Sequence, residues 1–271
     1  MAKVTNEGRH QYFEKIKPYK AMIQSLLKRE ETILQLIKKD SRGAAIKRLT
    51  LAEEMIALAA NYVILSGISQ AILKLRSEES LNDGRKSLYK AVIYLEEVVS
   101  SLIDAPFSDY EERLAEIEAV DARKRYLLVR KMGLALQLLE TAYGDNTKWR
   151  WAFVELEGRF AAVAKNIMNL KTAVVNTDPE SPDYEPTMYH LRMIKKLMLQ
   201  AADRYREKYE LSTSRIDDFK QAINFLSALR RLHAVMGDRE EAEIIKKKLD
   251  IWAVKLETDI RKQEELGNKK P

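Results

Sequence analysis

Histidine, cysteine and carboxylate side chains supply most catalytic and metal-binding groups. In this 271-residue sequence, few of these residues have a spacing that would bring them together in one site. It has no cysteine, which excludes disulfide bonds, thiol nucleophiles and thiolate metal sites. Its histidines, His10, His190 and His233, lie far apart along the chain. Glu7 and His10 form one Glu-x-x-His pair, but a di-iron helical bundle needs two such pairs and two further inward-facing glutamates. We therefore predict no metal site and no bound cofactor.

Paired carboxylates are the second source of chemistry, and the sequence offers them only as neighbours. Glu53–Glu54 and Glu96–Glu97 are adjacent, and adjacent side chains point about 100° apart on a helix, so neither pair forms an acid–base couple. Deep burial of Glu53 or Glu54 would raise its pKa, but we expect both at the rim of the core. The sequence also lacks a glycine-rich phosphate loop and a Gly-x-Ser-x-Gly motif. We therefore predict no enzymatic activity and rank an enzyme with a pocket between helices last.

Basic residues are densest between positions 123 and 131. Arg123 and Arg130 are seven residues apart, as are Lys124 and Lys131, so each pair shares a helix face. A phosphate-binding stripe has this pattern, and so does an ordinary solvated helix face. The net charge of +6 permits an acidic partner without requiring one. These four residues are candidate partner contacts, and nucleic-acid binding is an alternative function.

Trp151 is the fifth candidate contact, because it falls among Arg150, Glu155 and Arg159. A tryptophan on a charged face is often an anchor of a protein interface. The alternative, of equal weight, is that a second helix of the same chain covers it. Trp252 lies on an apolar stripe and is expected in the core.

The elements that carry these residues are all expected to be helices. Apolar residues recur at spacings of three and four along every long segment, and no alternating strand pattern is present. We predict an all-α fold, an elongated bundle or stack of helical hairpins with seven to eight long helices and short turns. The expected helices span residues 8–39, 42–77, 84–104, 109–143, 148–175, 187–211, 215–236 and 239–266.

Residues 55–73 form a stretch of nineteen without a charged side chain, inside the helix expected at 42–77. Such a stretch is either a membrane span or the centre of a large core. Polar residues such as Asn61, Ser66 and Gln70 interrupt it, and no second segment of this kind exists. We therefore expect no membrane span and a wholly buried helix.

The segment 177–186, rich in proline and acidic residues, is the expected linker. It would separate an N-terminal five-helix bundle (residues 1–176) built around helix 42–77 from a C-terminal three-helix segment (residues 187–271). We expect the two parts to pack as one elongated unit. The helix expected at 148–175 carries a heptad seam, typical of packing against another helix. Its members are Trp149, Phe153, Leu156, Phe160, Val163, Ile167, Leu170 and Val174.

One short segment resembles the turn and second-helix opening of a tetratricopeptide repeat, a helical-hairpin module that binds proteins. The resemblance covers about fifteen residues and rests on Leu229, Gly237, Asp238, Glu240, Glu241 and Ala242. His233, Lys246 and Val254 stand where the repeat has a tyrosine, an aromatic residue and a proline. Because no 34-residue period recurs either, we assign the chain to no family on this basis.

The function expected from these observations is that of a non-enzymatic helical scaffold or interaction protein. It would bind other proteins, or assemble with itself as a homo-oligomer, through long helical faces. The N-terminus MAKVTNEGRHQYFEK lacks the apolar core of a signal peptide. We therefore expect a cytoplasmic protein, with a mature exported product as the alternative.

Overall fold

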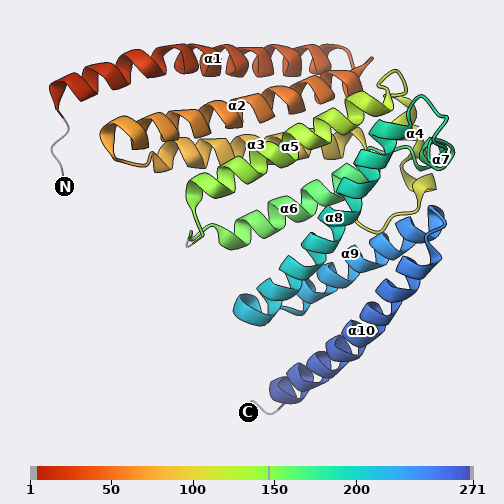
Figure 1. Ribbon diagram of the computed structural model, residues 1–271. Coiled ribbons are helices and arrows are strands. Elements are labelled where there is room, and N and C mark those ends of the chain that lie inside the picture. Colours follow the sequence, from red (N-terminus) through yellow and green to blue (C-terminus); the bar gives the residue numbers. More distant parts are fainter. Residues whose placement is uncertain (1–4, 146, 269–271) are drawn as a thin grey trace. The chain divides into compact units, whose positions relative to one another are not determined.

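The computed structural model describes residues 5–145 and 147–268, which form helices and turns with no β-strand among them (Figure 1). Eight of the helices described are long, which confirms the all-α prediction. They are α1 (Asn6–Lys39), α2 (Ala44–Leu73), α3 (Glu78–Val98), α5 (Ala122–Tyr143), α6 (Arg150–Asn166), α8 (Tyr184–Lys208), α9 (Ile216–Val235) and α10 (Arg239–Asn268). Shorter helical segments are η1 (Phe107–Asp109), α4 (Glu111–Ala115), α7 (Leu170–Val175) and the π turn η2 (Tyr209–Thr213).

The chain divides into two compact units, and each is built from two stretches of sequence. The first unit comprises residues 1–100 and 113–150, and the second comprises residues 101–112 and 151–271. The segment 177–186 predicted as a linker lies inside the second unit, where it connects α7 to α8 and its last three residues begin α8. Helix α6 belongs with the C-terminal helices, and the ion pair between Glu157 on α6 and Arg204 on α8 is one of the contacts that join them.

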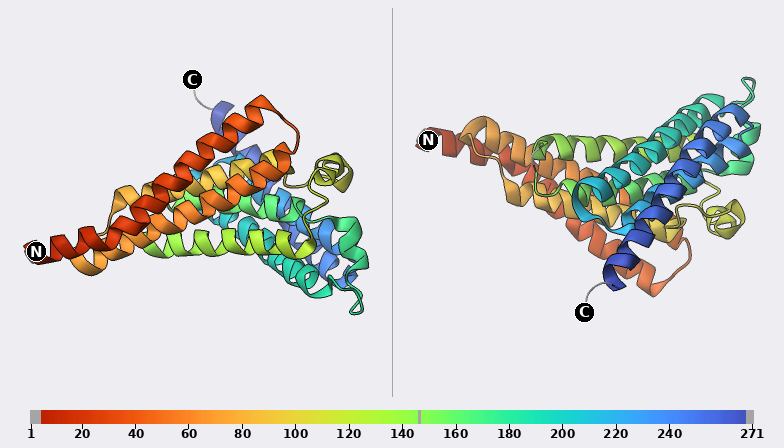
Figure 2. Two further views of the ribbon diagram at one scale, coloured as in Figure 1. Left: turned by 90° about the horizontal axis from the view of Figure 1, so that it is seen from above. Right: turned by 90° about the horizontal axis from the view of Figure 1, so that it is seen from below.

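In the first unit, α1, α2 and α3 follow one another through short turns, and α5 packs on α2 and α3. Figure 2 shows α1 lying along α2. A polar cluster joins α1 to α3: the Lys90 ammonium donates to both carboxylate oxygens of Glu30 at 2.9 Å, and the Tyr94 hydroxyl donates to the same carboxylate at 2.6 Å. The core around α2 is apolar and includes Leu51, Met55, Leu58, Leu88, Leu95 and Leu139.

Helix α2 is not wholly buried, so that prediction is wrong. Ala57, Gly67 and Ala71 are exposed, and Ile64 is 40% exposed. Only 33% of the most apolar window of α2 is buried, and within the described residues α2 is the one helix long and apolar enough to span a membrane. Length and composition do not separate such a span from the core helix of a soluble protein. The error arose because small residues such as alanine and glycine carry no charge, so they look like core residues in the sequence. They also bury little apolar surface, so a helix face made of them can remain exposed.

Helix α3 begins six residues earlier than the sequence pattern suggests. The Ser77 hydroxyl accepts a hydrogen bond from the Ser80 backbone N–H at 3.3 Å, and Glu78 and Glu79 occupy the first turn, where the helix dipole favours acids. Residues 78–83, left between the helices expected at 42–77 and 84–104, therefore belong to α3, and that predicted interruption is wrong. Gly84 lies inside α3, where a Cβ would come within 3.3 Å of the Leu139 side chain on α5. This glycine is a point of close helix packing.

The helix predicted at 109–143 is two helices, because residues 116–121 form turns between α4 and α5. Asp121 caps α5, with its Oδ1 accepting the Lys124 backbone N–H at 2.7 Å. The buried guanidinium of Arg125 donates to the carbonyls of Ile117 and Val120 at 2.8 Å and holds the turns in place. Arg123 and Lys124 consequently lie in the first turn of α5, where cations oppose the helix dipole, and not in the middle of a helix.

In the second unit, α9 packs against α8 and α10. The turn between α9 and α10 contains Gly237 with φ +79°, a left-handed conformation that glycine adopts without strain. The end predicted for the helix at 215–236, which is α9, is confirmed. The helix predicted at 148–175 is divided at Asn169, whose side chain accepts the N–H groups of Lys171 and Thr172 and caps α7. Buried aromatic rings fill the core here, including Phe153, Phe160, Tyr205, Phe219, Phe225 and Trp252.

Candidate functional site

The four basic residues of the predicted contact stripe are all exposed on α5, but only two of them are free of ion pairs. Lys124 pairs with Asp121 at 3.0 Å, and Lys131 pairs with Glu53 of α2 at 2.9 Å. Arg123 and Arg130 have no ion-pair partner in the part of the chain that the structure describes. The basic stripe is therefore reduced to two unpaired guanidinium groups.

Three leucines lie between and beyond these two arginines on the same side of α5. Leu127, Leu134 and Leu138 are 37%, 51% and 53% exposed. They fall three or four residues from Arg123, Arg130 or one another, so all five side chains share one helix face. This face, from Arg123 to Leu138, extends for about 22 Å along the helix axis. It combines exposed apolar surface with unpaired positive charge.

The exposed strip of α2 lies beside this face of α5. Glu53, which pairs with Lys131, is four residues before Ala57 and so begins the strip that continues through Ile64 to Ala71. Since α2 and α5 pack together, this ion pair places both exposed strips on one side of the first unit. We call the combined surface the α2–α5 face. It consists of Ala57, Ile64, Gly67, Ala71, Arg123, Leu127, Arg130, Leu134 and Leu138.

Trp151, the fifth predicted contact, is half-buried in the second unit and already has an interaction partner. Trp151 and the α2–α5 face therefore belong to different units. Trp252 is buried in the core, which confirms that prediction. Trp149 lies in the first unit beneath the guanidinium of Arg85, whose Cζ is 4.1 Å from the ring centroid.

The titratable residues singled out from the sequence occupy separate places. His10 is exposed, His190 is buried with Nε2 3.0 Å from the Ala164 carbonyl, and His233 is buried with Nδ1 3.2 Å from Asp238. Burial lowers the pKa of His233 below its usual value, which favours the neutral ring. Among the described residues, no three histidine or carboxylate side chains gather where they could hold a metal ion.

Glu53 and Glu54 also separate, as their adjacent positions on α2 require. Glu53 is exposed, as expected, but Glu54 is buried, so the expectation that both lie at the rim is wrong for Glu54. Burial raises the pKa of Glu54, and the guanidinium of Arg29, 2.5 Å away, opposes that rise. This pair ties α1 to α2 and is a structural contact.

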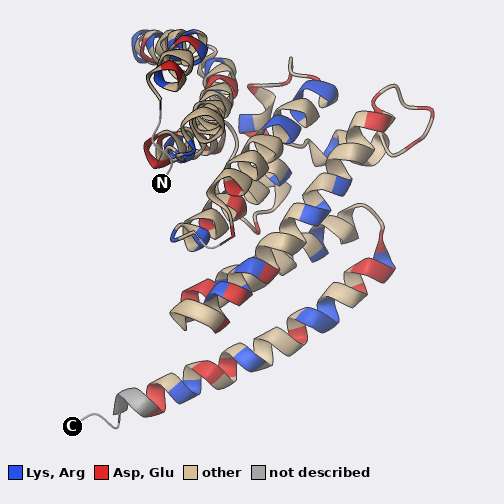
Figure 3. Ribbon diagram, turned by 60° about the vertical axis from the view of Figure 1, so that its left-hand side comes forward, with Lys and Arg blue, Asp and Glu red and all other residues tan. Residues whose placement is uncertain are grey.

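The other basic clusters lie among acids. Figure 3 shows Lys and Arg alternating with Asp and Glu along α10, which carries the Lys246–Lys247–Lys248 cluster. Lys248 pairs with Asp203 at 2.7 Å, and Lys246 lies 3.9 Å from Glu243. Helix α10 therefore presents no field of a single sign.

Sequence reasoning missed the three exposed leucines of α5 because it attended only to the charges in that segment. The signal was present: positions 127, 134 and 138 repeat at helical spacing with Arg123 and Arg130. The burial of the opposite face by Leu128, Met132 and Leu139 then determines that these leucines point outward.

Comparison with known proteins gives a family and little else. The model of the TP0443 family matches residues 8–260, a range that covers all or part of every long helix. No curated protein matches the sequence. A solved structure described as "Computational Design of Self-Assembling Cyclic Protein Homooligomers" aligns with 92% of this chain and 97% of its own length, at 13% identity and a TM-score of 0.28. A similarity at that TM-score carries no argument about this chain.

Proposed function

The chain belongs to the TP0443 family, and we propose that this member is a non-enzymatic interaction protein whose α2–α5 face binds an acidic amphipathic helix of a partner protein. The observation that carries the proposal is the repeated pairing of exposed leucine with unpaired arginine along one face of α5. An amphipathic helix docks by placing apolar residues at spacings of three, four and seven into such a surface.

The chemistry of the face selects the partner. Leu134, Leu138 and Ile64 offer apolar area that a partner helix can cover with its own leucines. The guanidinium groups of Arg123 and Arg130 match carboxylates, which they can bind with two parallel hydrogen bonds. The partner should therefore carry acidic residues beside its apolar stripe.

Nucleic-acid binding fits the same face less well. Phosphate contacts need several free cations, and ion pairs already occupy Lys124 and Lys131. Exposed leucines between the remaining arginines contribute nothing to a phosphate backbone. Self-association is also less favoured, because a second copy would bring the same unpaired arginines to the interface.

The test uses a designed 20-residue helical peptide with leucines at heptad spacing flanked by glutamates, labelled for fluorescence anisotropy. The full-length protein should bind this peptide, and Leu134→Glu or Arg130→Glu should weaken binding by about tenfold or more, since each removes a central contact. Leu36→Glu is the matched control, because Leu36 is 50% exposed on α1 and lies outside the face.

Three results would contradict the proposal. The first is equal binding of a peptide in which lysine replaces every glutamate. The second is unchanged affinity in Leu134→Glu and Arg130→Glu. The third is a concentration-dependent dimer, seen by light scattering, that Leu134→Glu dissociates, since that result would assign the face to a second copy of the chain.

A further inference from the structure

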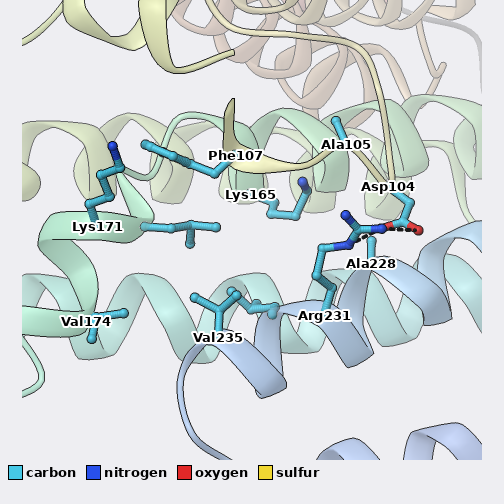
Figure 4. A pocket seen from close by; sticks show the side chains of 11 residues that line it. Asp104, Ala105, Phe107, Lys165, Lys171, Val174, Ala228, Arg231 and Val235 are labelled. Carbon is cyan, nitrogen blue, oxygen red and sulfur yellow. Dashed lines mark hydrogen bonds and ion pairs between the residues drawn. The ribbon is translucent and has the colours of Figure 1, made fainter. Parts of the chain in front are cut away.

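The second unit contains a pocket of about 310 Å³ whose surface is almost entirely apolar, although charged side chains also line it (Figure 4). One end is apolar, with Phe107 of η1, Val174 of α7 and Val235 of α9 around it. Leu170 and Leu232 line the pocket as well. Lys165 lies near the middle of the lining, and Arg231 and Asp104 lie on the side away from Val174. A volume of this size is at the lower limit of small-molecule sites, which are mostly apolar with a few polar groups that orient the ligand.

Lys165 is the unusual one among the charged residues of the lining. It comes from α6, is only 4% exposed, and has no hydrogen-bond or ion-pair partner among the residues described. The ring of Tyr110 lies close to it, with its centroid 5.3 Å from the Lys165 ammonium nitrogen. Burial, opposed by Asp104 and aided by Arg231, lowers the pKa of Lys165 to about 8. At pH 7 the pocket therefore contains a buried ammonium group that the Asp104 carboxylate stabilises without forming an ion pair with it.

The neighbouring charges leave this ammonium unbalanced. The guanidinium of Arg231 pairs with Asp104 through contacts of 3.0 and 3.2 Å. At the far edge of the pocket, Lys171 pairs with Glu111 at 2.5 Å. Each of these pairs is neutral, so when Glu111 is counted together with the lining residues, the net charge is +1 and is located on Lys165.

We propose that this pocket is a binding site for a small monocarboxylic acid with an apolar tail. The carboxylate binds the Lys165 ammonium beside Arg231, and the tail lies among Phe107, Val174 and Val235. A single negative charge matches the net charge of the lining, whereas a phosphate dianion would leave excess charge in apolar surroundings. A neutral lipid would leave the ammonium unpaired.

The proposal assigns Lys165 a role that its structural surroundings do not explain. A lysine that served only to fill space would be replaced at lower free-energy cost by methionine, since burial of an unpaired charge is unfavourable. A ligand carboxylate completes the ion pair and adds hydrogen bonds to a charged donor, which are among the stronger contacts in proteins.

The test is isothermal titration calorimetry of the full-length protein with octanoate at pH 7. Octanoate should bind, while acetate (the head group without the tail) and 1-octanol (the tail without the charge) should bind at least about tenfold more weakly. Lys165→Met should reduce octanoate affinity by a similar factor. The control Lys196→Met removes an exposed lysine of α8 and should leave affinity unchanged.

Two further measurements test the proposal even if the Lys165→Met variant misfolds. Val235 is 45% exposed, so Val235→Glu should fold normally and still lose octanoate binding, because it places a carboxylate at the apolar end. In NMR spectra of protein with labelled lysine, octanoate should raise the pKa of Lys165 and of no other lysine. Equal affinity of 1-octanol and octanoate, full affinity in Lys165→Met, or no binding at millimolar octanoate would each overturn the proposal.

Discussion

Lys165 is a buried, charged side chain in an otherwise apolar core, and its burial destabilises the folded protein. Its neighbours on α6, including Ala161, Ala162 and Ala164, are fully buried, and among them only the lysine lines the pocket. Lowering a lysine pKa means that the folded protein holds the proton less tightly than the unfolded chain does. The stability of the protein must therefore depend on pH through this residue.

We predict that Lys165→Met stabilises the protein in a buffer without carboxylates, by about 3 kcal/mol at pH 7. The pKa of Lys165 is about 8 in the folded protein and its ordinary value is 10.5, so the unfolded state binds more protons between these values. The penalty is complete below pH 8 and diminishes as the pH rises toward 10.5. The advantage of Lys165→Met over the wild-type protein, measured by urea denaturation, should shrink over that range.

Lys196→Met serves as the control, because this exposed lysine should give a small stability change that does not vary with pH. A Lys165→Met protein that is less stable than wild type at pH 7, or whose advantage is constant from pH 7 to pH 10.5, would show that the amine is not in an unfavourable setting.

At the scale of the element, α6 is the helix whose packing departs most from a simple amphipathic pattern. The heptad seam predicted for it is buried at Phe153, Leu156 and Phe160, but Val154 and Gly158 on the other side are buried as well. Gly158 faces the stacked rings of Tyr205 and Phe225, whose centroids are 5.7 Å apart. A Cβ at position 158 would lie 2.6 Å from Tyr205 Cε2 and 3.2 Å from Phe225 Cζ.

Gly158→Ala should therefore destabilise the protein, by about 1–3 kcal/mol, because the added methyl group forces two packed rings to move. Gly67→Ala is the matched substitution in α2, where a Cβ would have no neighbour within 4 Å. It should stabilise the protein by about 0.5–1 kcal/mol through the higher helix propensity of alanine. Thermal denaturation of the two variants measures both signs, and equal shifts in Tm would refute the packing argument.

The sequence was sufficient to predict the helices themselves but not where two of them break. Asp121 and Asn169 act as caps only because turns precede them. In the sequence, each looks like an ordinary polar position within a continuous helix. The reverse error occurred before Gly84: residues 78–83 were left between two helices, although they belong to α3, in which Gly84 is a point of close packing. Local capping hydrogen bonds set these helix ends, and only the packing of Gly84 against Leu139 is tertiary; the spacing of apolar residues reports neither.

The candidate sites were predicted only in part. Arg123 and Arg130 could be named from their spacing, but the loss of Lys124 and Lys131 to ion pairs depends on Asp121 and on Glu53 of another helix. Lys165 left a signal that went unused: it is the one charge in the apolar run from Phe160 to Met168. The pocket around it unites η1, α6, α7 and α9, and no spacing within one helix could indicate that assembly.

At the scale of the whole molecule, the segment 101–112 determines how the chain is divided between the two units. It belongs to the second unit, although the residues on both sides of it belong to the first. Its contacts explain the assignment. The Asn166 side chain donates to the Leu102 carbonyl at 3.0 Å, Arg231 binds Asp104, and Lys171 binds Glu111. Ala105 and Tyr110 are buried.

Hydrogen exchange measured by mass spectrometry should reveal this division. Gly158→Ala, which perturbs the second unit, should speed exchange in peptides from residues 105–112 together with those from α8 and α9. Peptides from α2 and α3 should exchange at the wild-type rate. If α3 lost protection while residues 105–112 kept theirs, the segment would belong with its neighbours along the chain.

The same segment imposes an order on synthesis. A chain growing from its N-terminus completes every residue of the first unit at Arg150, whereas Lys165, Asn166 and Arg231 have yet to be made. During that interval the aromatic rings of Phe107 and Tyr110 have no partners from the second unit to cover them. At this stage the nascent chain contains the complete first unit and a loop, residues 101–112, with exposed aromatic rings. We expect a chaperone of nascent chains to bind this loop.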